Sequence, residues 1–275
     1  MSDDRYRFTV GDVECLAIKD AENTSETRQL FSNIDEKKYQ AALKTQGDNP
    51  EIAILSCNPL AVFSDDWVLI DTGFGAMATP NGQSVDILND EDIRPEHIIL
   101  SHAHGDHYGG LLNKNGDENF SNVPVYMCQN EWMFYTSGEY ADANPQRAER
   151  VQKYLLPAER QIERIECLNM SEILPGFTVL KLPGHTPHHI GILVESMGET
   201  LIVAGDTALH PLHLAHLDWE FANDADHDTA RESRLKLAEL AIELDALVMF
   251  YHFPFPGLGR IERNGAGYRW VPLAI

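Results

Sequence analysis

The sequence predicts a fold of the α+β class, in which helices accompany β-sheets, on three observations. Short apolar runs typical of buried strands recur along the chain, and segments with helical periodicity stand between them. Several of the apolar runs end directly at a histidine or an aspartate. A polar side chain at the exit of a buried strand is held rigidly, as a catalytic site requires, so the same pattern predicts where a site lies.

The elements are expected in the following order. A hairpin turns at Gly11 and Asp12, and the polar residues 20–30 indicate a loop. Strands are expected at residues 6–10, 13–18, 52–57, 60–63, 67–70, 97–101, 177–182, 190–195, 201–204 and 246–251. Helices are expected at residues 35–44, 129–136, 145–165 and 229–243, the last with Leu235, Leu237, Leu240 and Ile242 toward the core.

Length and composition indicate one domain that spans residues 1–275. The chain has 275 residues with 43% hydrophobic content, which is ordinary for a globular protein with a substantial core. We find no Gly/Ser-rich or Pro-rich linker, no low-complexity tract and no repeat at a fixed period.

The charge balance argues against a nucleic-acid partner. The formal net charge is −22, from 21 basic and 43 acidic residues, whereas phosphate contacts need lysine and arginine. The first residues lack the features of a signal peptide, and no apolar stretch approaches the ~20 residues that span a membrane. The four cysteines are far apart and contain no Cys-x-x-Cys pair, so we interpret them as buried thiols in a reducing compartment. We therefore expect a cytoplasmic protein with no membrane partner.

The segment SHAHGDHYGG is the most informative stretch of the chain. It places His102, His104, Asp106 and His107 within six residues, and imidazole and carboxylate are the common ligands of catalytic zinc. Because alternate residues of an extended segment point the same way, His102 and His104 can reach one ion. Asp106 and His107 lie beyond the turn at Gly105 and can reach a second. The alternative, a solvated histidine-rich loop, does not explain the ligands that the rest of the chain supplies.

Further candidate ligands follow later apolar runs. His185 lies in KLPGHTPHHIGILV, Asp206 follows LIVAG, and His252 follows ALVMFY. Asp206 alone also fits a turn or helix cap. Asp71 leaves another strand, where it either orients a metal ligand or caps the Asp-Thr-Gly turn.

Together these motifs resemble the metallo-β-lactamase superfamily. The matches are LIDTG at 69–73, SHAHGDH at 101–107, PGHT at 183–186, GD at 205–206 and the late His252, in the order that the family keeps. The resemblance implies an αββα sandwich, with two mixed sheets face to face, helices outside and metals at one edge.

The resemblance also implies a site for two divalent metal ions. His102, His104 and His185 would bind one ion, Asp106, His107 and His252 the other, and Asp206 would bridge both. A bridging aspartate is similar to the pattern of the lactonases, glyoxalase II, the RNA-processing nucleases and the phosphotriesterase-like branch. Zinc is the expected metal, while manganese, iron or cobalt suit the same ligands.

The tail HFPFPGLGRIERNGAGYRWVP resembles the methyl parathion hydrolase group, near the N-acyl-homoserine lactonases. On that resemblance Phe253 and Phe255 line the substrate cleft, with core packing as the alternative. The segment 210–224 would supply a second wall through His210, Leu212 and Trp219; its histidines could instead be hydrogen-bonded and inert.

This sequence departs from its relatives at two points. His188 and His189 follow the PGHT turn, where many relatives have glycine two residues after the threonine. Ala208, Leu209 and His210 occupy the place where some lactonases carry a tyrosine that helps the leaving group.

The expected activity is metal-dependent hydrolysis of lactones or related esters, with promiscuity toward organophosphate triesters. A hydroxide shared between two metals would attack the substrate, and Asp106 would pass its proton to the leaving group. The chain has neither a Gly-x-Ser-x-Gly elbow nor a P-loop. The alternatives are a glyoxalase II-like thioesterase, an iron-dependent redox enzyme and a non-catalytic metal-binding protein. The expected partners are a small ester or lactone and a second copy of the chain in a homodimer.

Overall fold

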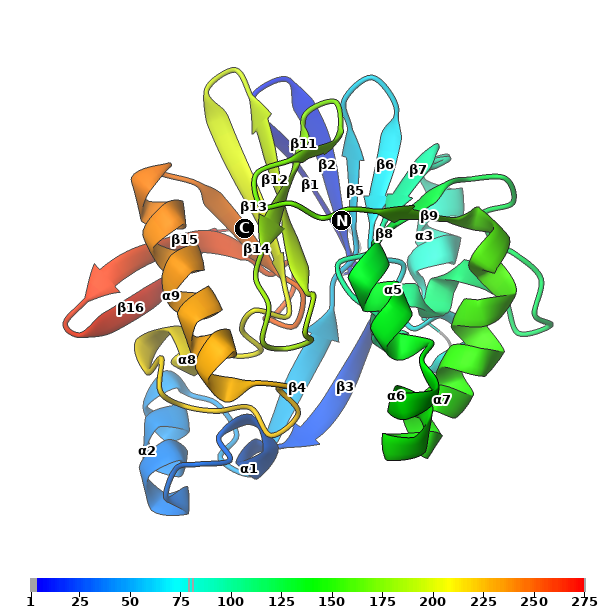
Figure 1. The fold of residues 1–275 in the computed structure, drawn as a ribbon. Coiled ribbons are helices and arrows are strands. Elements are labelled where there is room, and N and C mark those ends of the chain that lie inside the picture. The colour runs from blue at the N-terminus through cyan, green and yellow to red at the C-terminus, as the bar shows by residue number, and fades with distance from the viewer. Residues whose placement is uncertain (1–3, 79, 81, 275) are drawn as a thin grey trace.

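Two seven-stranded sheets pack face to face, with helices on their outer sides (Figure 1). The structure, a computed structural model, describes residues 4–78, 80 and 82–274. The strand orders are β1-β2-β5-β6-β7-β8-β9 and β10-β11-β12-β13-β14-β15-β16, and β3 and β4 form a separate two-stranded ribbon. This arrangement confirms the αββα sandwich that the sequence motifs imply.

Each large sheet combines parallel and antiparallel pairs. In the first sheet the pairs from β1 to β6 are antiparallel, and those from β6 to β9 are parallel. In the second sheet only β13 and β14 run parallel. The strands are β1 Arg5–Val10, β2 Val13–Ile18, β3 Ala21–Glu26, β4 Ile52–Cys57, β5 Leu60–Phe63, β6 Trp67–Ile70, β7 His97–Ile99, β8 Val125–Cys128, β9 Ile162–Ile165, β10 Glu172–Leu174, β11 Phe177–Lys181, β12 Ile190–Ser196, β13 Glu199–Gly205, β14 Leu247–Phe250, β15 Leu258–Asn264 and β16 Gly267–Pro272.

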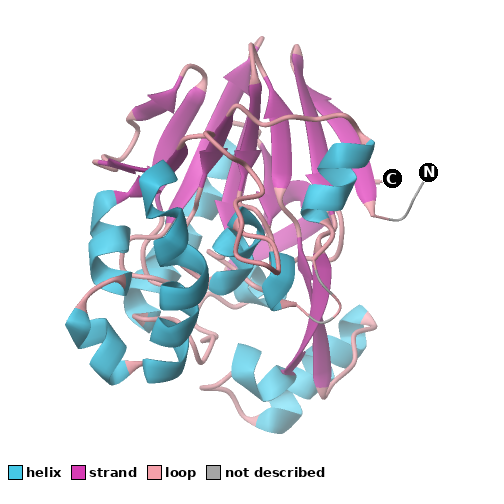
Figure 2. Ribbon diagram, turned by 90° about the vertical axis from the view of Figure 1, so that its right-hand side faces the viewer, coloured by secondary structure: helices cyan, strands magenta, loops and turns pink. Residues whose placement is uncertain are grey.

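The helices cover the outer faces and gather toward one end of the sandwich (Figure 2). Helix α2 begins at Asp35, whose carboxylate accepts from the Lys37 amide at 3.1 Å, and ends at Gly47 in the left-handed conformation. The helical segments are α1 Thr27–Leu30, α2 Glu36–Gln46, η1 Gly75–Met77, α3 Ser84–Asp90, α4 Gly105–Tyr108, η2 Gly109–Leu111, α5 Gln129–Tyr135, α6 Gly138–Ala143, α7 Pro145–Arg150, η3 Val151–Leu155, η4 Leu156–Gln161, α8 Leu212–Ala215 and α9 His227–Glu243.

The core explains why the central strands are apolar throughout. Successive side chains of a strand point to opposite faces, and both faces of these sheets are covered. Along β13, Leu201 and Val203 pack between the two sheets, whereas Ile202 and Ala204 pack under α9. Helix α9 contributes Leu237, which is fully buried. The expectation that Leu235 faces the core is wrong, because its side chain is 43% exposed.

Three other expectations need correction. Residues 20–30 contain β3 and α1 instead of a loop, because β3 pairs in full register with β4. Residues 145–165 do not form one helix but divide into α7, η3, η4 and strand β9. Pro157 lies in the first turn of η4, where a proline cannot continue a preceding helix. Cys128 and Cys167 are joined by a disulfide, whereas we expected four free thiols; Cys15 and Cys57 are free and buried.

Within the described residues, no helix is both long and apolar enough to cross a membrane. The single-domain organisation and the cytoplasmic location stay predictions.

Candidate active site

The candidate ligands follow strands whose carboxyl ends meet at one edge of the sandwich. Strands β6 and β7 run parallel and lead to Asp71 and His102, and strands β13 and β14 run parallel and lead to Asp206 and His252. His185 enters from the loop between β11 and β12. The topology thus brings together side chains that lie up to 150 residues apart in sequence, which is the convergence that the strand-exit pattern predicts.

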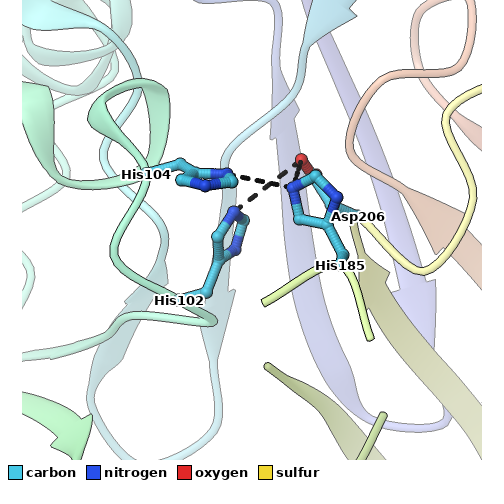
Figure 3. Close-up of side chains that lie close together, drawn as sticks. All are labelled: His102, His104, His185 and Asp206. Carbon is cyan, nitrogen blue, oxygen red and sulfur yellow. Dashed lines mark hydrogen bonds and ion pairs between the residues drawn. The ribbon is translucent and has the colours of Figure 1, made fainter. Parts of the chain in front are cut away.

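The first group contains His102, His104, His185 and Asp206 (Figure 3). One donor atom from each lies within 4.8 Å of the others. The Nε2 atom of His185 is 3.2 Å from the Asp206 carboxylate and 2.9 Å from the Nδ1 atom of His104. The Nε2 atom of His102 is 3.8 Å from the same Asp206 oxygen. These separations are those of several ligands around one cation.

A second group contains His107, His252 and Asp206. The Nε2 atom of His107 is 3.4 Å from Asp206 Oδ1, and the Nε2 atom of His252 is 3.1 Å from Asp206 Oδ2. Asp106 joins this side, with its Oδ2 atom 3.3 Å from His252 Nε2. Asp206 therefore belongs to both groups, the position that a bridging ligand needs.

Cys57 also lies close to Asp106 and His252. Burial raises the pKa of the Cys57 thiol to about 12. The Sγ atom lies 4.0 Å from His252 Nδ1, the ring nitrogen that faces away from Asp206, so Cys57 stands outside the two ligand groups.

Three buried atoms of the two groups lack a hydrogen-bond partner within the described residues, and they fit a metal ion. They are His102 Nε2, His107 Nε2 and Asp206 Oδ1. A buried polar atom without a partner costs free energy, and a cation at the centre of the cluster would satisfy all three. Burial lowers the pKa of His102 well below its usual range, and the positive charges of His107 and His104 act in the same direction. A neutral imidazole is the form that binds a metal.

The Asp206 carboxylate is held in its ionised form. Burial alone would raise its pKa, but the imidazoles of His252 and His107 lower it well below the usual range. Its backbone amide donates to His189 Nε2 at 3.0 Å, and His189 Nδ1 lies 3.0 Å from the carbonyl oxygen of Leu182. His189, whose role was open, therefore anchors the main chain at Asp206.

In each of the five clustered histidines, the ring nitrogen that faces away from the cluster has a partner. Such contacts fix the tautomer and the orientation of a metal-binding imidazole. The pairs are His102 Nδ1 with Ser101 Oγ, His104 Nε2 with Tyr135 Oη, His107 Nδ1 with Asp71 Oδ2, His185 Nδ1 with Asp224 Oδ1, and His252 Nδ1 with the Ser56 carbonyl, all at 2.8–3.0 Å.

These contacts bear on the role of Asp71 and add two residues, Tyr135 and Asp224, to those around the candidate ligands. Asp71 contacts His107 and accepts from the Ser101 amide at 2.8 Å, contacts that favour the orienting role over a simple cap. Tyr135 and Asp224 were not among the candidates. The first ends a helix and the second ends a loop, and no local motif marks either one.

Glu131 links the two ligand loops. It lies on α5, is fully buried, and accepts from the Ala103 amide and the His188 amide, each at 3.1 Å. Burial raises the pKa of Glu131 to about 7, although these amides oppose the rise. One carboxylate thus ties the SHAHGDH loop to the loop after His185, a role that the sequence left unmarked.

Replacing Glu131 with glutamine is expected to lower kcat/KM for hydrolysis by about 10- to 100-fold, the usual cost of losing a contact behind the ligands. The amide group cannot accept from one of the two N–H donors, so one loop loses its anchor. Kinetics of Glu131→Gln beside the exposed Glu139→Gln would measure this. Equal rates in both variants would rule out the anchoring role.

The histidines of segment 210–224 are held by local contacts. His213 Nε2 lies 2.7 Å from the Leu30 carbonyl, and His216 stacks on Trp219 at 4.1 Å between ring centroids. His210 Nδ1 accepts from the Leu212 amide at 3.1 Å. The interpretation that these histidines are hydrogen-bonded or packed fits these contacts.

Three expected substrate contacts are wrong. Phe253 is fully buried and stacks on Phe250 at 4.2 Å, since the chain turns into the core directly after His252. Trp219 is 1% exposed and packs on Phe31, and Leu212 is 3% exposed in the same cluster. Leu212 and Trp219 pack with residues of α1 and α2, whereas the later part of the same segment contacts His185 through Phe221 and Asp224.

Two cavities adjoin the ligand cluster. The first, of about 920 Å³, is lined by His104, Asp106, His185, Asp206 and His252. The second, of about 840 Å³, touches His252 and has an apolar wall that includes Ile52, Ile54 and Phe255. His210 also lines the second cavity, so His210 and Phe255 keep a place at the site.

Comparison with known protein families shows which superfamily the chain belongs to. Residues 55–251 match the metallo-beta-lactamase superfamily. The chain belongs to this superfamily. The match spans the strands that lead to Asp71, His102, Asp206 and His252.

Curated relatives within the superfamily include lactonases. An N-acyl homoserine lactonase of Bacillus cereus is 28% identical over 208 residues, covering 67% of this chain and 76% of the relative. A probable metallo-hydrolase, YflN, of Bacillus subtilis (strain 168) is 26% identical over 240 residues, covering 80% and 88%.

Solved structures of the superfamily share the fold across the whole chain. The dizinc quorum-quenching lactonase AidC, solved in complex with a product, superposes with a TM-score of 0.89 at 24% identity, covering 99% of this chain and 98% of that one. The hydrolase AbOPH gives a TM-score of 0.90 at 25% identity, covering 100% and 99%. The chain is a hydrolase of the metallo-beta-lactamase superfamily with lactonase-like relatives, and its histidine and aspartate groups can hold a metal ion.

Proposed function

We propose that the enzyme opens lactones with the help of two divalent metal ions, most naturally zinc. The observation that carries this proposal is the position of Asp206 in both ligand groups, with unpartnered histidine nitrogens around it. The lactonases among its relatives and the dizinc metal content of AidC support the choice of substrate and metal.

The seven residues divide between two ions as the sequence motifs imply. His102, His104 and His185 would hold one ion, Asp106, His107 and His252 the other, and Asp206 both. Ions held there would supply activated water and an electrophile for the substrate's carbonyl oxygen at neutral pH.

Asp106 is the proposed proton carrier. Its side chain is 18% exposed and lines the larger cavity, next to the atoms that face the substrate. Burial would raise the pKa of this carboxyl, but His107 and His252 hold it well below the usual range. The ionised carboxylate is the form that accepts a proton, so Asp106 would take one from the attacking water and release it to the leaving alkoxide.

The two cavities suit the two ends of an acyl lactone. The polar cavity takes the ring at the ligand cluster, and the apolar wall around Ile54 and Phe255 takes a hydrocarbon chain. A neutral phosphotriester presents the same combination of a polar centre and apolar arms, so slower organophosphate hydrolysis belongs to the proposal. A homodimer also stays a prediction.

A substrate panel tests the function. Protein stripped of metal and reloaded with zinc, manganese or cobalt is assayed on an acyl-homoserine lactone, an aromatic lactone, an aryl ester, a phosphotriester and a glutathione thioester. The proposal predicts metal-dependent lactone cleavage at the highest kcat/KM of the five. A preference for the thioester would assign the enzyme to glyoxalase II-like chemistry, and a metal-loaded protein inactive on all five would contradict the proposal.

A further inference from the structure

Three basic side chains line the larger cavity together with the metal ligands. Arg147 and Arg150 of α7 and Lys153 of η3 contribute to its wall, together with one acidic residue of the same stretch, Glu149. Helices α6 and α7 lie at the same end of the sandwich as the β3–β4 ribbon (Figure 1). Residues 147–153 thus bring an excess of two positive charges to the cavity wall, in a chain whose net charge is −22, while the acidic residues Asp106 and Asp206 line the cavity at the ligand cluster.

Arg147 and Arg150 differ from most arginines of this chain. Within the described residues neither forms an ion pair with a carboxylate. Arginines elsewhere do so: Arg5, Arg7, Arg28, Arg94, Arg164, Arg231, Arg234, Arg260, Arg263 and Arg269. Because acidic residues outnumber basic ones twofold here, two arginines without carboxylate partners beside a cavity are available to a ligand.

Tyr140 supplies a second observation. Its side chain lines the same cavity and is only 5% exposed, and its hydroxyl, which lies beside Arg147, donates to no acceptor within the described residues. A buried hydroxyl without an acceptor costs free energy, which a ligand that accepts its proton would recover. The cavity therefore offers a hydroxyl donor beside two guanidinium groups, a combination that suits an oxygen anion.

We propose that the substrate carries a carboxylate remote from the bond that is cleaved, and that Arg147 and Arg150 bind it with the help of Tyr140. This inference rests on the proposed lactone hydrolysis and names the substrate class within it. A guanidinium group matches the two oxygens of a carboxylate.

The test compares two substrates that differ only in charge. One is hexanoyl-homoserine lactone, and the other carries a carboxylate at the end of the same acyl chain. In the wild type we expect a lower KM for the carboxylated lactone, and we expect added salt to raise that KM alone. The double variant Arg147→Gln/Arg150→Gln is expected to raise KM for the carboxylated lactone about tenfold, because exposed ion pairs contribute modestly, and to leave the neutral lactone within about twofold.

Arg160→Gln is the matched control. Arg160 is also exposed and forms no ion pair with a carboxylate within the described residues, but it does not line the cavity. It should keep the wild-type preference. A wild type with no preference for the carboxylated lactone, or a preference that survives the double substitution, would overturn the inference.

Calorimetry separates this inference from the proposed function. The two matching lactams resist hydrolysis, so their binding to metal-loaded protein reports recognition without turnover. A tighter Kd for the carboxylated lactam, lost in the double variant, supports the inference even if neither lactone is hydrolysed, and in that case only the proposed function fails. Hydrolysis of both lactones with equal lactam affinities would overturn the inference alone.

Discussion

Replacement of Asp206 by asparagine is expected to lower kcat/KM for lactone hydrolysis about a thousandfold, which corresponds to a loss of ~4 kcal/mol of transition-state stabilisation. Among the described residues Asp206 alone belongs to both ligand groups, and a neutral amide binds a cation far less strongly than a carboxylate. The shape of the side chain is kept, and the backbone amide of residue 206 still donates to His189. The variant should therefore fold, and its circular dichroism should match that of the wild type.

The matched control is Asp228→Asn. Asp228 lies in the first turn of α9 with its side chain 89% exposed, and it belongs to neither ligand group. Its variant should keep wild-type kinetics. If Asp206→Asn retained more than about a tenth of the activity, a loss of under ~1.4 kcal/mol, the bridging role would be refuted.

Removal of the metal is expected to abolish hydrolysis and to lower the Tm by about 5–10 °C. A ligand present at about 100 times its Kd adds ~2.7 kcal/mol to the stability of the folded state, and each kcal/mol shifts the Tm by about 2–4 °C at this size. The ligand cluster also contains the buried carboxylate of Asp206 and the partly buried carboxylate of Asp106, whose negative charges a bound cation would stabilise. Thermal unfolding with and without a chelator would measure the shift.

Thermal unfolding of Asp206→Asn with and without the chelator is the control for the wild-type measurement. Because this variant binds metal weakly, the chelator should change its Tm much less than that of the wild type. Activity that survives exhaustive chelation, with no metal in the protein by mass spectrometry, would contradict the metal-dependent mechanism. A change in Tm of equal size in both proteins would show that the chelator acts elsewhere.

The candidate ligands can be picked out from the sequence because their signals are local. His102, His104, Asp106 and His107 stand in one short segment, and Asp206 and His252 follow runs of buried strand residues. Such runs are recognisable in the sequence because the central strands are covered on both faces and are therefore apolar along their whole length. Strands β4, β5 and β6 have the bounds that the sequence predicts.

Features that depend on contacts between residues distant in sequence cannot be predicted from local sequence patterns. Strand β3 is polar and lacks alternation, and it is a strand only because β4, about 30 residues later, pairs with it. Trp219 illustrates a second limit, since a large aromatic side chain suits a cleft wall and a core equally, and only the contact with Phe31 decides. Glu131 and Tyr135 gain their roles from the docking of α5 on the ligand loops, which no periodicity encodes.

The most direct test of the account is a metal titration of stripped protein, followed by initial rates of lactone hydrolysis. The account predicts that activity rises with added zinc and reaches its maximum at two ions per chain, because two ligand groups share Asp206. Full activity at one ion per chain, or rates that do not depend on added metal, would contradict it.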